Sequence, residues 1–389
     1  MRVGIYTVKP VPEAGGSFTL LETIIQDIVS SDCKHEFFIF FNDSNAPQRY
    51  NKDNITYINC YQKKPSIFFK VIRKIFRVFF NRNITITIND ILHNENIDLL
   101  WILGPYNIDI TVPFIFTVWD LGHRIFPFFP EYKSNIWDSR EVTYNKMLKK
   151  ATYIITGNRI GKTEIVENYS INPDKIHIIP FPIPTFCLKN NKNNNTSSIQ
   201  IKQPFIFYPA QFWAHKNHII IIEAIAWLRD TKNIIINCYF TGHDYGNLFH
   251  IKNMIKKYKM DDQIFILGFI PQEDIIHFYK NALAMVFPSF IGPNNLPLLE
   301  AVAFGCPLLY SNISGHIEQM EGTGLPFDTT NYIDLGENIY KIFYDSKFRE
   351  DIILKEQMFL EKYKSYSYFI KMKEIIDMFS IYNKTWKEQ

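Results

Sequence analysis

The chain has 389 residues, of which 47% are hydrophobic and 21% charged, and its formal net charge is +3. This is an ordinary globular composition, and the length exceeds one typical hydrophobic core, so two domains are expected. The small positive excess is only weak evidence for nucleic-acid binding, and no nucleic-acid partner is predicted.

The first expected element is a strand at residues 2–8, RVGIYTV, which starts without the charged and apolar regions of a signal peptide. The longest uncharged stretches contain Pro and Asn, so no transmembrane helix is expected. The five cysteines are scattered and form neither a disulfide framework nor a CxxC metal pair. The predicted location is therefore the reducing cytoplasm.

Apolar runs of strand length then alternate with helical segments through the first half of the chain. The expected elements are a helix at 18–31 and strands at 35–42, 98–103, 114–121, 152–157 and 175–182. Strands that are apolar on both faces, with helices between them, indicate a parallel sheet covered on both sides.

The composition changes at 189–198, KNNKNNNTSS, a polar segment that predicts a linker. The alternation then restarts, with strands at 204–210, 236–242, 263–270, 282–288 and 306–311, and helices at 217–230, 247–258, 273–281 and 297–304. The predicted parts are a domain at 1–188, a linker at 189–199, a domain at 200–365 and a C-terminal helix at 366–389. Ligands of doubly wound sheets bind beyond the C-terminal ends of the strands, so a cleft between the domains is the expected site.

One transition from strand to helix in the second domain is suited to an anion. Pro297 fits the first turn of a helix that Gly305 ends, and the free N–H groups of such a helix start favour a bound phosphate. Glu300 lies one turn into this helix. It either complements the helix dipole or accepts hydrogen bonds from sugar hydroxyls beside that phosphate, and the loop alone does not distinguish the two.

Three other groups follow strand ends. Gly15 and Gly16 allow a ligand to approach the backbone closely, although any tight turn could use them. Lys216 is placed to neutralise a diphosphate leaving group, unless it is a solvated loop lysine. Either Asp120 or His123 could hold a hydroxyl or serve as a base. Equally, Asp120 could be a turn former and His123 a structural histidine.

Four segments carry a family resemblance: PSFIGPNNLPLLEAVAFGCPLLYSNISG, YPAQFWAHKNH, GFIPQEDIIHFYKNA and TVWDLGHRIFPFFPE. They resemble glycosyltransferase family 4, whose members have the α/β GT-B fold of two Rossmann-like domains facing a central cleft. The resemblance covers nearly the whole chain. It implies retaining transfer from a nucleotide-diphosphate sugar to a glycan or polyprenyl-linked acceptor in surface-polysaccharide assembly, such as O-antigen or capsule.

The resemblance also implies roles for domains and residues. The first domain would bind the acceptor and the second the donor, with the C-terminal helix returning to the first. Glu300 would bind the donor ribose, Lys216 the diphosphate, and the N–H groups near Asn295 and Leu296 the phosphate. The candidate catalytic residues are Asp120, His123 and Lys216, and the candidate donor-binding residues are Gly15, Gly16, Gln211, Lys216, Gly242, Phe269, Ile270, Asn294, Asn295, Leu296 and Glu300.

The sequence departs from the family pattern at three positions. Gly292 stands where many members have the first of two glutamates, Gln211 where an Arg is common, and Trp119 where the His of a His-Asp pair is usual. We expect Asn294 or Asn295 to contact the sugar in place of the missing Glu.

No Asp-x-Asp pair occurs in the chain, so a metal-bridged diphosphate is not expected, and neither a metal nor a cofactor is predicted. Two alternatives to a glycosyltransferase are considered. A GT-B-fold sugar-nucleotide epimerase would need an acid/base set for proton removal. A non-catalytic nucleotide-sugar-binding subunit is suggested by Gly292 and Gln211.

The segment KKPSIFFKVIRKIFRVFFNR, residues 63–82, has apolar residues at helical spacing and no acid. It is either a surface helix whose apolar stripe packs on the first sheet or a helix at an anionic membrane surface. The candidate membrane-binding residues on its basic face are Lys70, Arg73, Lys74 and Arg77.

Overall fold

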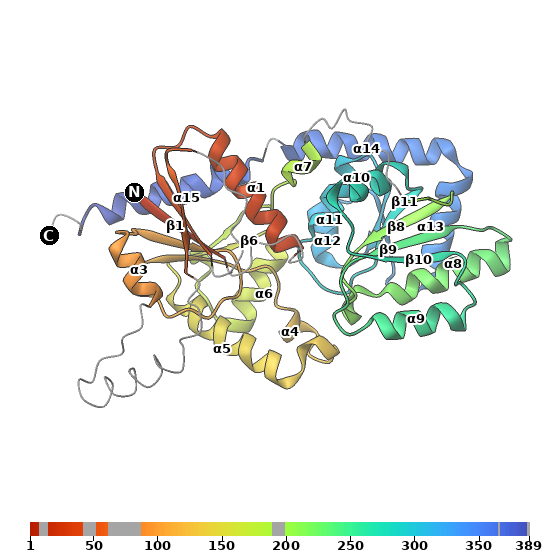
Figure 1. The fold of residues 1–389 in the computed structure, drawn as a ribbon, viewed down its shortest axis with the longest axis horizontal. Coiled ribbons are helices and arrows are strands. Elements are labelled where there is room, and N and C mark those ends of the chain that lie inside the picture. The colour runs from red at the N-terminus through yellow and green to blue at the C-terminus, as the bar shows by residue number, and fades with distance from the viewer. Residues whose placement is uncertain (8–14, 42–51, 61–86, 189–198, 365, 387–389) are drawn as a thin grey trace.

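The computed structural model describes residues 1–7, 15–41, 52–60, 87–188, 199–364 and 366–386. These residues form two α/β domains, each built on a parallel sheet with helices on both faces (Figure 1). The predicted segment at 63–82, with its four basic residues, lies outside the described residues.

The N-terminal sheet has the strand order β3-β2-β1-β4-β5-β6-β7. Its strands are β1 (Arg2–Thr7), β2 (Glu36–Phe41), β3 (Ile55–Asn59), β4 (Leu99–Ile102), β5 (Phe114–Thr117), β6 (Tyr153–Thr156) and β7 (Ile176–Ile178). The helices that connect them are α1 (Gly16–Ser30), α3 (Ile88–Asn94), α4 (Gly122–Ile125), α5 (Ser134–Lys150) and α6 (Arg159–Tyr169). Every pairing in this sheet is parallel, as the apolar strand runs predict.

The C-terminal sheet has the order β10-β9-β8-β11-β12-β13 and is also parallel. Its strands are β8 (Phe205–Pro209), β9 (Asn237–Thr241), β10 (Ile264–Gly268), β11 (Ala284–Phe287), β12 (Leu308–Ser311) and β13 (Leu325–Phe327). Its helices, with α7 preceding the domain, are α7 (Thr185–Leu188), α8 (His218–Lys232), α9 (Leu248–Lys257), α10 (Gln272–Asn281), α11 (Leu296–Ala303), α12 (Ser314–Met320), α13 (Tyr332–Tyr344) and α14 (Ser346–Lys364).

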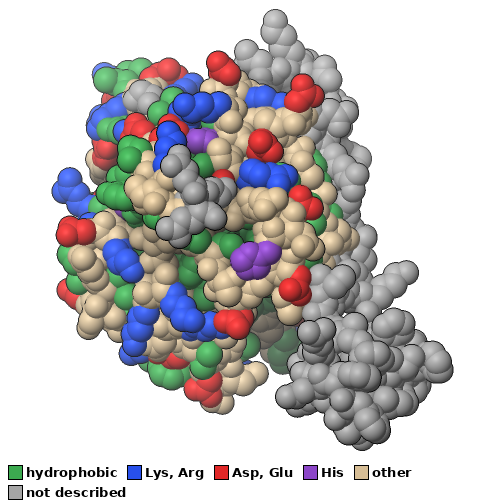
Figure 2. All heavy atoms as spheres, turned by 90° about the vertical axis from the view of Figure 1, so that its left-hand side faces the viewer, with side chains coloured by type: hydrophobic (Ala, Val, Ile, Leu, Met, Phe, Trp, Pro, Cys, Tyr) green, Lys and Arg blue, Asp and Glu red, His purple; other side chains and the backbone are tan. Residues whose placement is uncertain are grey.

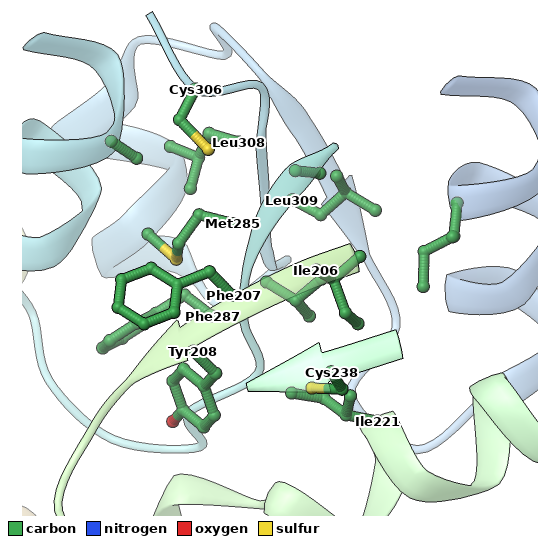
Figure 3. Packing of buried hydrophobic residues seen from close by; sticks show 14 of the residues in the cluster. Ile206, Phe207, Tyr208, Ile221, Cys238, Met285, Phe287, Cys306, Leu308 and Leu309 are labelled. Atoms are coloured by element: carbon green, nitrogen blue, oxygen red, sulfur yellow. The ribbon is translucent and has the colours of Figure 1, made fainter. Parts of the chain in front are cut away.

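The central strands of the C-terminal sheet are buried along nearly their whole length. Figure 3 shows Ile206, Phe207 and Tyr208 of β8 packed with Met285 and Phe287 of β11. None of the five side chains is more than 1% exposed. Close packing of this kind fixes the carboxyl ends of the strands, where the site described below is located.

The last helix belongs to the other domain. After α14 has packed along the C-terminal domain, α15 (Tyr368–Asn383) runs beside β1 (Figure 1). Its apolar residues, including Tyr368, Met372 and Ile376, are buried in one cluster with α1 and β1. The aromatic ring of Tyr368 stacks on Trp101 of β4, with centroids 6.1 Å apart. The chain therefore passes between the domains twice.

A second interdomain contact caps the N-terminus of α6. Glu318, on α12 of the C-terminal domain, accepts hydrogen bonds from the backbone N–H groups of Arg159 at 2.8 Å and Ile160 at 3.1 Å. Asn158 caps the same helix and donates to the carbonyl of Pro293 at 2.6 Å. These are the N–H groups that a helix start leaves without intrahelical partners, so one domain satisfies the helix end of the other.

Figure 2 shows acidic and basic side chains interspersed over the visible part of the N-terminal end of the molecule. This mixture agrees with the weak net charge of the sequence. Within the part of the chain that the structure describes, no helix combines the length and apolar character needed to cross a membrane.

Candidate functional site

Two cavities open between the domains at the carboxyl ends of the strands. The larger has a volume of about 840 Å³ and the smaller about 530 Å³. They share one stretch of wall, lined by Gly15, Gly16, Pro209, Ala210, Gln211, Leu296 and Pro297. The two cavities therefore form one continuous cleft with two compartments.

The starts of two helices meet at the shared wall. The N-cap of α1 is Gly15, and that of α11 is Asn295; neither helix start has a side-chain cap bond. Gly15 has φ +66°, a conformation that other residues adopt only with strain. Two uncapped helix starts facing one cleft make the shared wall attractive to an anion. Helix α11 begins at Leu296, one residue before the predicted start.

The larger cavity contains the acid of α11. Glu300 is 9% exposed, and its Oε2 accepts a hydrogen bond from the Tyr279 hydroxyl at 2.9 Å. Burial raises the pKa of Glu300 to about 7, although that hydrogen bond opposes the shift. A carboxyl group held in this way at a cavity wall can bind hydroxyl groups of a ligand.

Three other predicted donor residues line the larger cavity: Gly242, Phe269 and Ile270. Phe269 is 49% exposed, and its ring stacks on that of His243 with centroids 5.1 Å apart. A Cβ on Gly242 would lie 2.5 Å from the carbonyl oxygen of Ala210, so this position needs glycine. An exposed ring with a close backbone beside it suits a flat, partly apolar group such as a nucleobase.

Lys216 lines the smaller cavity. Its Nζ lies 4.9 Å from the centroid of the Phe287 ring and donates to Oδ1 of Asn295 at 3.3 Å. Burial lowers the pKa of Lys216 to about 8, and the charges of Asp120 and Glu131 oppose the shift. The amine is thus mostly protonated at neutral pH and available to an anion.

A relay of hydrogen bonds orients that lysine. The Ser311 hydroxyl donates to the carbonyl of Ser289, and Oγ of Ser311 contacts Nδ1 of His316, each at 2.7 Å. Nε2 of His316 lies 2.7 Å from Nδ2 of Asn295, whose Oδ1 holds Lys216. Burial lowers the pKa of His316 to about 3, so this ring is neutral and its Nε2 accepts from the amide.

Two expectations for Asn295 need correction. Its backbone N–H donates to Oε1 of Gln319 at 2.8 Å, so this group is not available to a phosphate as predicted. Its side chain is also engaged, by Lys216 and His316, so Asn295 orients Lys216 and is not a sugar contact. Asn294, Asn295 and Leu296 all line the smaller cavity, and because the Asn295 amide is engaged, Asn294 remains the predicted amide for a sugar.

The departure at Gly292 has a local cause. The residue has φ +119°, and a Cβ there would lie 2.4 Å from Nδ2 of Asn295. A glutamate at this position would therefore be strained and would displace the amide that orients Lys216.

Asp120 lines the smaller cavity and forms an ion pair with Arg140. Its Oδ1 accepts from Arg140 Nη2 at 2.7 Å and from the backbone N–H of Gly122 at 2.8 Å. Burial favours a higher pKa for Asp120, but the charge of Arg140 and the Gly122 N–H outweigh it and hold the pKa below its usual value. Asp120 is thus ionised and weakly basic, which favours hydroxyl binding over proton abstraction.

His123 is not in the cleft, contrary to the catalytic role considered for it. The side chain is 0% exposed, lines neither cavity and stacks on Tyr144, with centroids 5.3 Å apart. Its Nε2 lies 2.9 Å from Oε1 of Glu141 and 3.1 Å from the Tyr169 hydroxyl. Burial lowers its pKa to about 4. His123 is a structural histidine, the alternative left open by the sequence.

Several cleft residues were not predicted. The smaller cavity also contains Glu131, Tyr132, Arg140, Trp213 and His215. The larger contains polar residues of α1. The polar residues of α1 could have been recognised from the sequence. They lie on one face of an otherwise apolar helix and are Thr19, Glu22, Thr23 and Gln26.

Two facing Rossmann-like sheets with a cleft at their carboxyl ends define the GT-B class, and this chain has that fold. Residues 190–357 match the family model described as "Glycosyl transferases group 1". The match lies mainly in the C-terminal domain and covers less than half of the chain, so this part of the sequence is similar to that glycosyltransferase family.

Two curated proteins are similar to part of the chain. The chain is 30% identical over 214 residues to O-antigen chain mannosyltransferase B of Escherichia coli, a match that covers 54% of this chain and 56% of that protein. It is 27% identical over 169 residues to O-antigen chain mannosyltransferase RfbU of Salmonella typhimurium, covering 43% and 44%. The chain thus spans about half the length of these curated relatives.

A solved structure extends the likeness in fold to nearly the whole chain. Anabaena HepE, determined in complex with UDP-glucose, superposes with a TM-score of 0.66 over 98% of this chain and 99% of that one. The sequence identity is 14%, so this likeness concerns the fold.

Proposed function

We propose that this protein is a retaining glycosyltransferase of family 4 that transfers a sugar from a nucleotide-diphosphate sugar to a glycan or polyprenyl-linked acceptor. The observation that carries the proposal is the continuous cleft, in which the starts of α1 and α11 lie between Glu300 and Lys216. The nucleoside would occupy the larger cavity, the diphosphate the shared wall and the transferred sugar the smaller cavity.

We assign each cleft residue a separate role in donor binding or catalysis. Glu300 binds the ribose hydroxyls, and Phe269 packs on the base. Lys216, oriented by Asn295, neutralises the charge that develops on the departing diphosphate. In the retaining transfer that the family resemblance implies, the acceptor hydroxyl attacks on the side of the leaving group. The glycosidic bond to the diphosphate breaks, the new one forms, and a phosphate oxygen takes the hydroxyl proton.

The names of the relatives suggest the pathway. The two curated relatives described above are O-antigen chain mannosyltransferases, which favours a hexosyl donor and a role in O-antigen or similar polysaccharide biosynthesis. Because Lys216 and two helix starts supply positive charge, the proposed reaction needs neither a metal nor a cofactor.

The test is a panel of nucleotide sugars, including UDP-glucose and GDP-mannose, incubated with lipid-linked and free glycan acceptors. Transfer to an acceptor with retained anomeric configuration, unchanged by excess EDTA, is the expected result. Release of an isomerised sugar would indicate an epimerase instead. Binding of nucleotide sugars without turnover would indicate a non-catalytic subunit, and activity that EDTA abolishes and Mg²⁺ restores would overturn metal independence.

Peripheral membrane binding through residues 63–82 is a separate proposal. Each Lys or Arg near an anionic surface contributes about 1 kcal/mol, so the basic face of this segment would favour salt-sensitive binding. The residues on that face are Lys70, Arg73, Lys74 and Arg77. Changing all four to Glu is expected to abolish cosedimentation with phosphatidylserine-containing liposomes and to leave activity on a soluble acceptor intact.

A charge-matched control for the membrane experiment uses the other domain. Lys252, Lys256, Lys257 and Lys259 are four exposed lysines on and just after α9. Their replacement by Glu should leave cosedimentation unchanged. If both sets of substitutions act equally, the binding follows net charge and the segment at 63–82 has no special role.

A further inference from the structure

A histidine and a carboxylate pair across the cleft. Oε1 of Glu131 accepts hydrogen bonds from the backbone N–H of His215, at 3.0 Å, and from Nδ1 of the same residue. Glu131 lies in the short helix Pro130–Tyr132 of the N-terminal domain, and His215 lies in the short helix Ala214–Lys216 of the C-terminal domain. The pair therefore exists only when the two domains face each other.

The pairing determines which ring nitrogen carries the proton. Burial favours a higher pKa for Glu131, but the hydrogen bonds from His215 outweigh it and hold the pKa below its usual value. An ionised carboxylate only accepts hydrogen bonds, so Nδ1 of His215 is the protonated nitrogen. Because burial lowers the pKa of His215, the ring is neutral and Nε2 has a free lone pair.

The free nitrogen belongs to a ring that lines the smaller cavity. Nε2 of His215 makes no hydrogen bond to any residue that the structure describes. Oδ1 of Asp120 is engaged by Arg140 and Oδ1 of Asn295 by Lys216, so Nε2 of His215 is an acceptor available to a ligand beside the Asp120 carboxylate. A neutral acceptor at this position suits a hydroxyl donor.

The position of Lys216 next to His215 indicates which part of the ligand supplies this hydroxyl. Lys216 directly follows His215 and is the group assigned above to the diphosphate. The group attached to that diphosphate on the side away from the nucleoside is the transferred sugar. The family glutamate that Gly292 replaces is absent, so this cavity lacks that acceptor for a sugar hydroxyl.

We propose that Nε2 of His215 accepts a hydrogen bond from a hydroxyl of the transferred sugar, and that Glu131 is a positioning residue that holds the ring in the required tautomer. This inference rests on the proposed glycosyltransferase function. Because Glu131 and His215 come from different domains, the sugar subsite is complete only in the closed arrangement of the two domains.

The test uses His215→Asn, because the Asn amide can still donate to Glu131 in place of Nδ1 but presents nothing at the position of Nε2. On the donor identified by the panel, kcat/KM should fall about tenfold, as expected for the loss of one hydrogen bond at a reacting sugar. Inhibition by the free nucleoside diphosphate should change less than twofold. His215→Gln, whose amide reaches toward the position of Nε2, should restore part of the activity.

Monodeoxy analogues of the donor distinguish a sugar contact from a structural effect. The penalty of His215→Asn should disappear with the analogue that lacks the contacted hydroxyl and remain with the others. Glu131→Gln should also lower kcat/KM, by a smaller factor, and this penalty should disappear with the same monodeoxy donor. His35 pairs with Asp377 through Nε2 at 2.8 Å and lies outside both cavities, so His35→Gln, whose amide can keep that bond, is the matched control and should leave kcat/KM unchanged.

The outcomes separate this proposal from the proposed function. If the wild-type protein transfers sugar but His215→Asn keeps kcat/KM within twofold, the sugar contact is wrong and the glycosyltransferase stands. A penalty that persists with every monodeoxy donor would likewise reject the contact, since it would reflect a structural role. If the wild-type protein transfers no sugar from any donor, both proposals fail.

Discussion

Lys216→Ala and Glu300→Ala are each expected to lower kcat/KM for sugar transfer at least tenfold. The lysine lies at the cavity wall, oriented by Asn295, whereas Arg140, the other cation lining this cavity, is paired with Asp120. Removing one preorganised group of this kind from a site of developing charge typically costs about 2 to 4 kcal/mol of transition-state stabilisation. Steady-state kinetics on folded variants measure the effect.

The same domain offers a matched control for each substitution. Lys232 also lies over an aromatic ring, with its Nζ 5.1 Å from the Trp227 centroid, but it is outside both cavities. Glu356 is a second buried glutamate with a raised pKa and is also outside the cleft. Lys232→Ala and Glu356→Gln should keep wild-type kinetics. Near-normal activity of both cleft variants would reject the donor-site assignment.

Glu356→Gln is expected to stabilise the protein, and more so as the pH rises. The side chain is 0% exposed, its Oε1 accepts from the Leu308 N–H at 2.9 Å, and burial raises its pKa to about 8. The folded protein therefore keeps this carboxyl protonated at pH values where the unfolded chain, with a pKa near 4.5, releases the proton. Stability is lost between these two pKa values, by about 3 kcal/mol at neutral pH.

Thermal unfolding of the wild type and Glu356→Gln at pH 4, 6 and 8 checks this prediction. The difference in midpoint temperature should be near zero at pH 4 and should grow to several degrees at pH 8, because the amide has no proton to lose. Glu300 and other buried carboxyls affect both proteins equally, so the difference isolates Glu356. A difference that does not depend on pH would contradict the buried, protonated state.

The parallel sheets could be predicted because their strands are buried on both faces and appear as continuous apolar runs. All strands predicted in this way are present, from β1 to β12. β3 and β13 were not predicted. The former is half-buried at one edge of its sheet, and the latter has three residues around a proline, so neither gives a strong apolar signal.

Some site residues could be predicted from the sequence pattern around them, whereas others depend on contacts between distant parts of the chain. Lys216, Glu300 and Gly15 follow strand ends or open helices, and the rule that ligands bind at the carboxyl ends of parallel strands places such residues in the cleft. The misassignment of His123 arose because the sequence could not show that α5, with Glu141 and Tyr144, covers it. The Glu131–His215 pair joins residues 84 positions apart in different domains, and no local pattern reports that distance.

The return of α15 to the N-terminal domain determines which fragments can exist alone. A fragment ending at residue 188 would expose the apolar faces of α1 and β1 that Tyr368, Met372 and Ile376 cover. Fragments for crystallography or binding studies therefore cannot be obtained by a single cut at the linker. The N-terminal domain needs its distant helix supplied on a second chain or joined through a new connection, whereas residues 200–364 form a continuous unit that can be excised by two cuts.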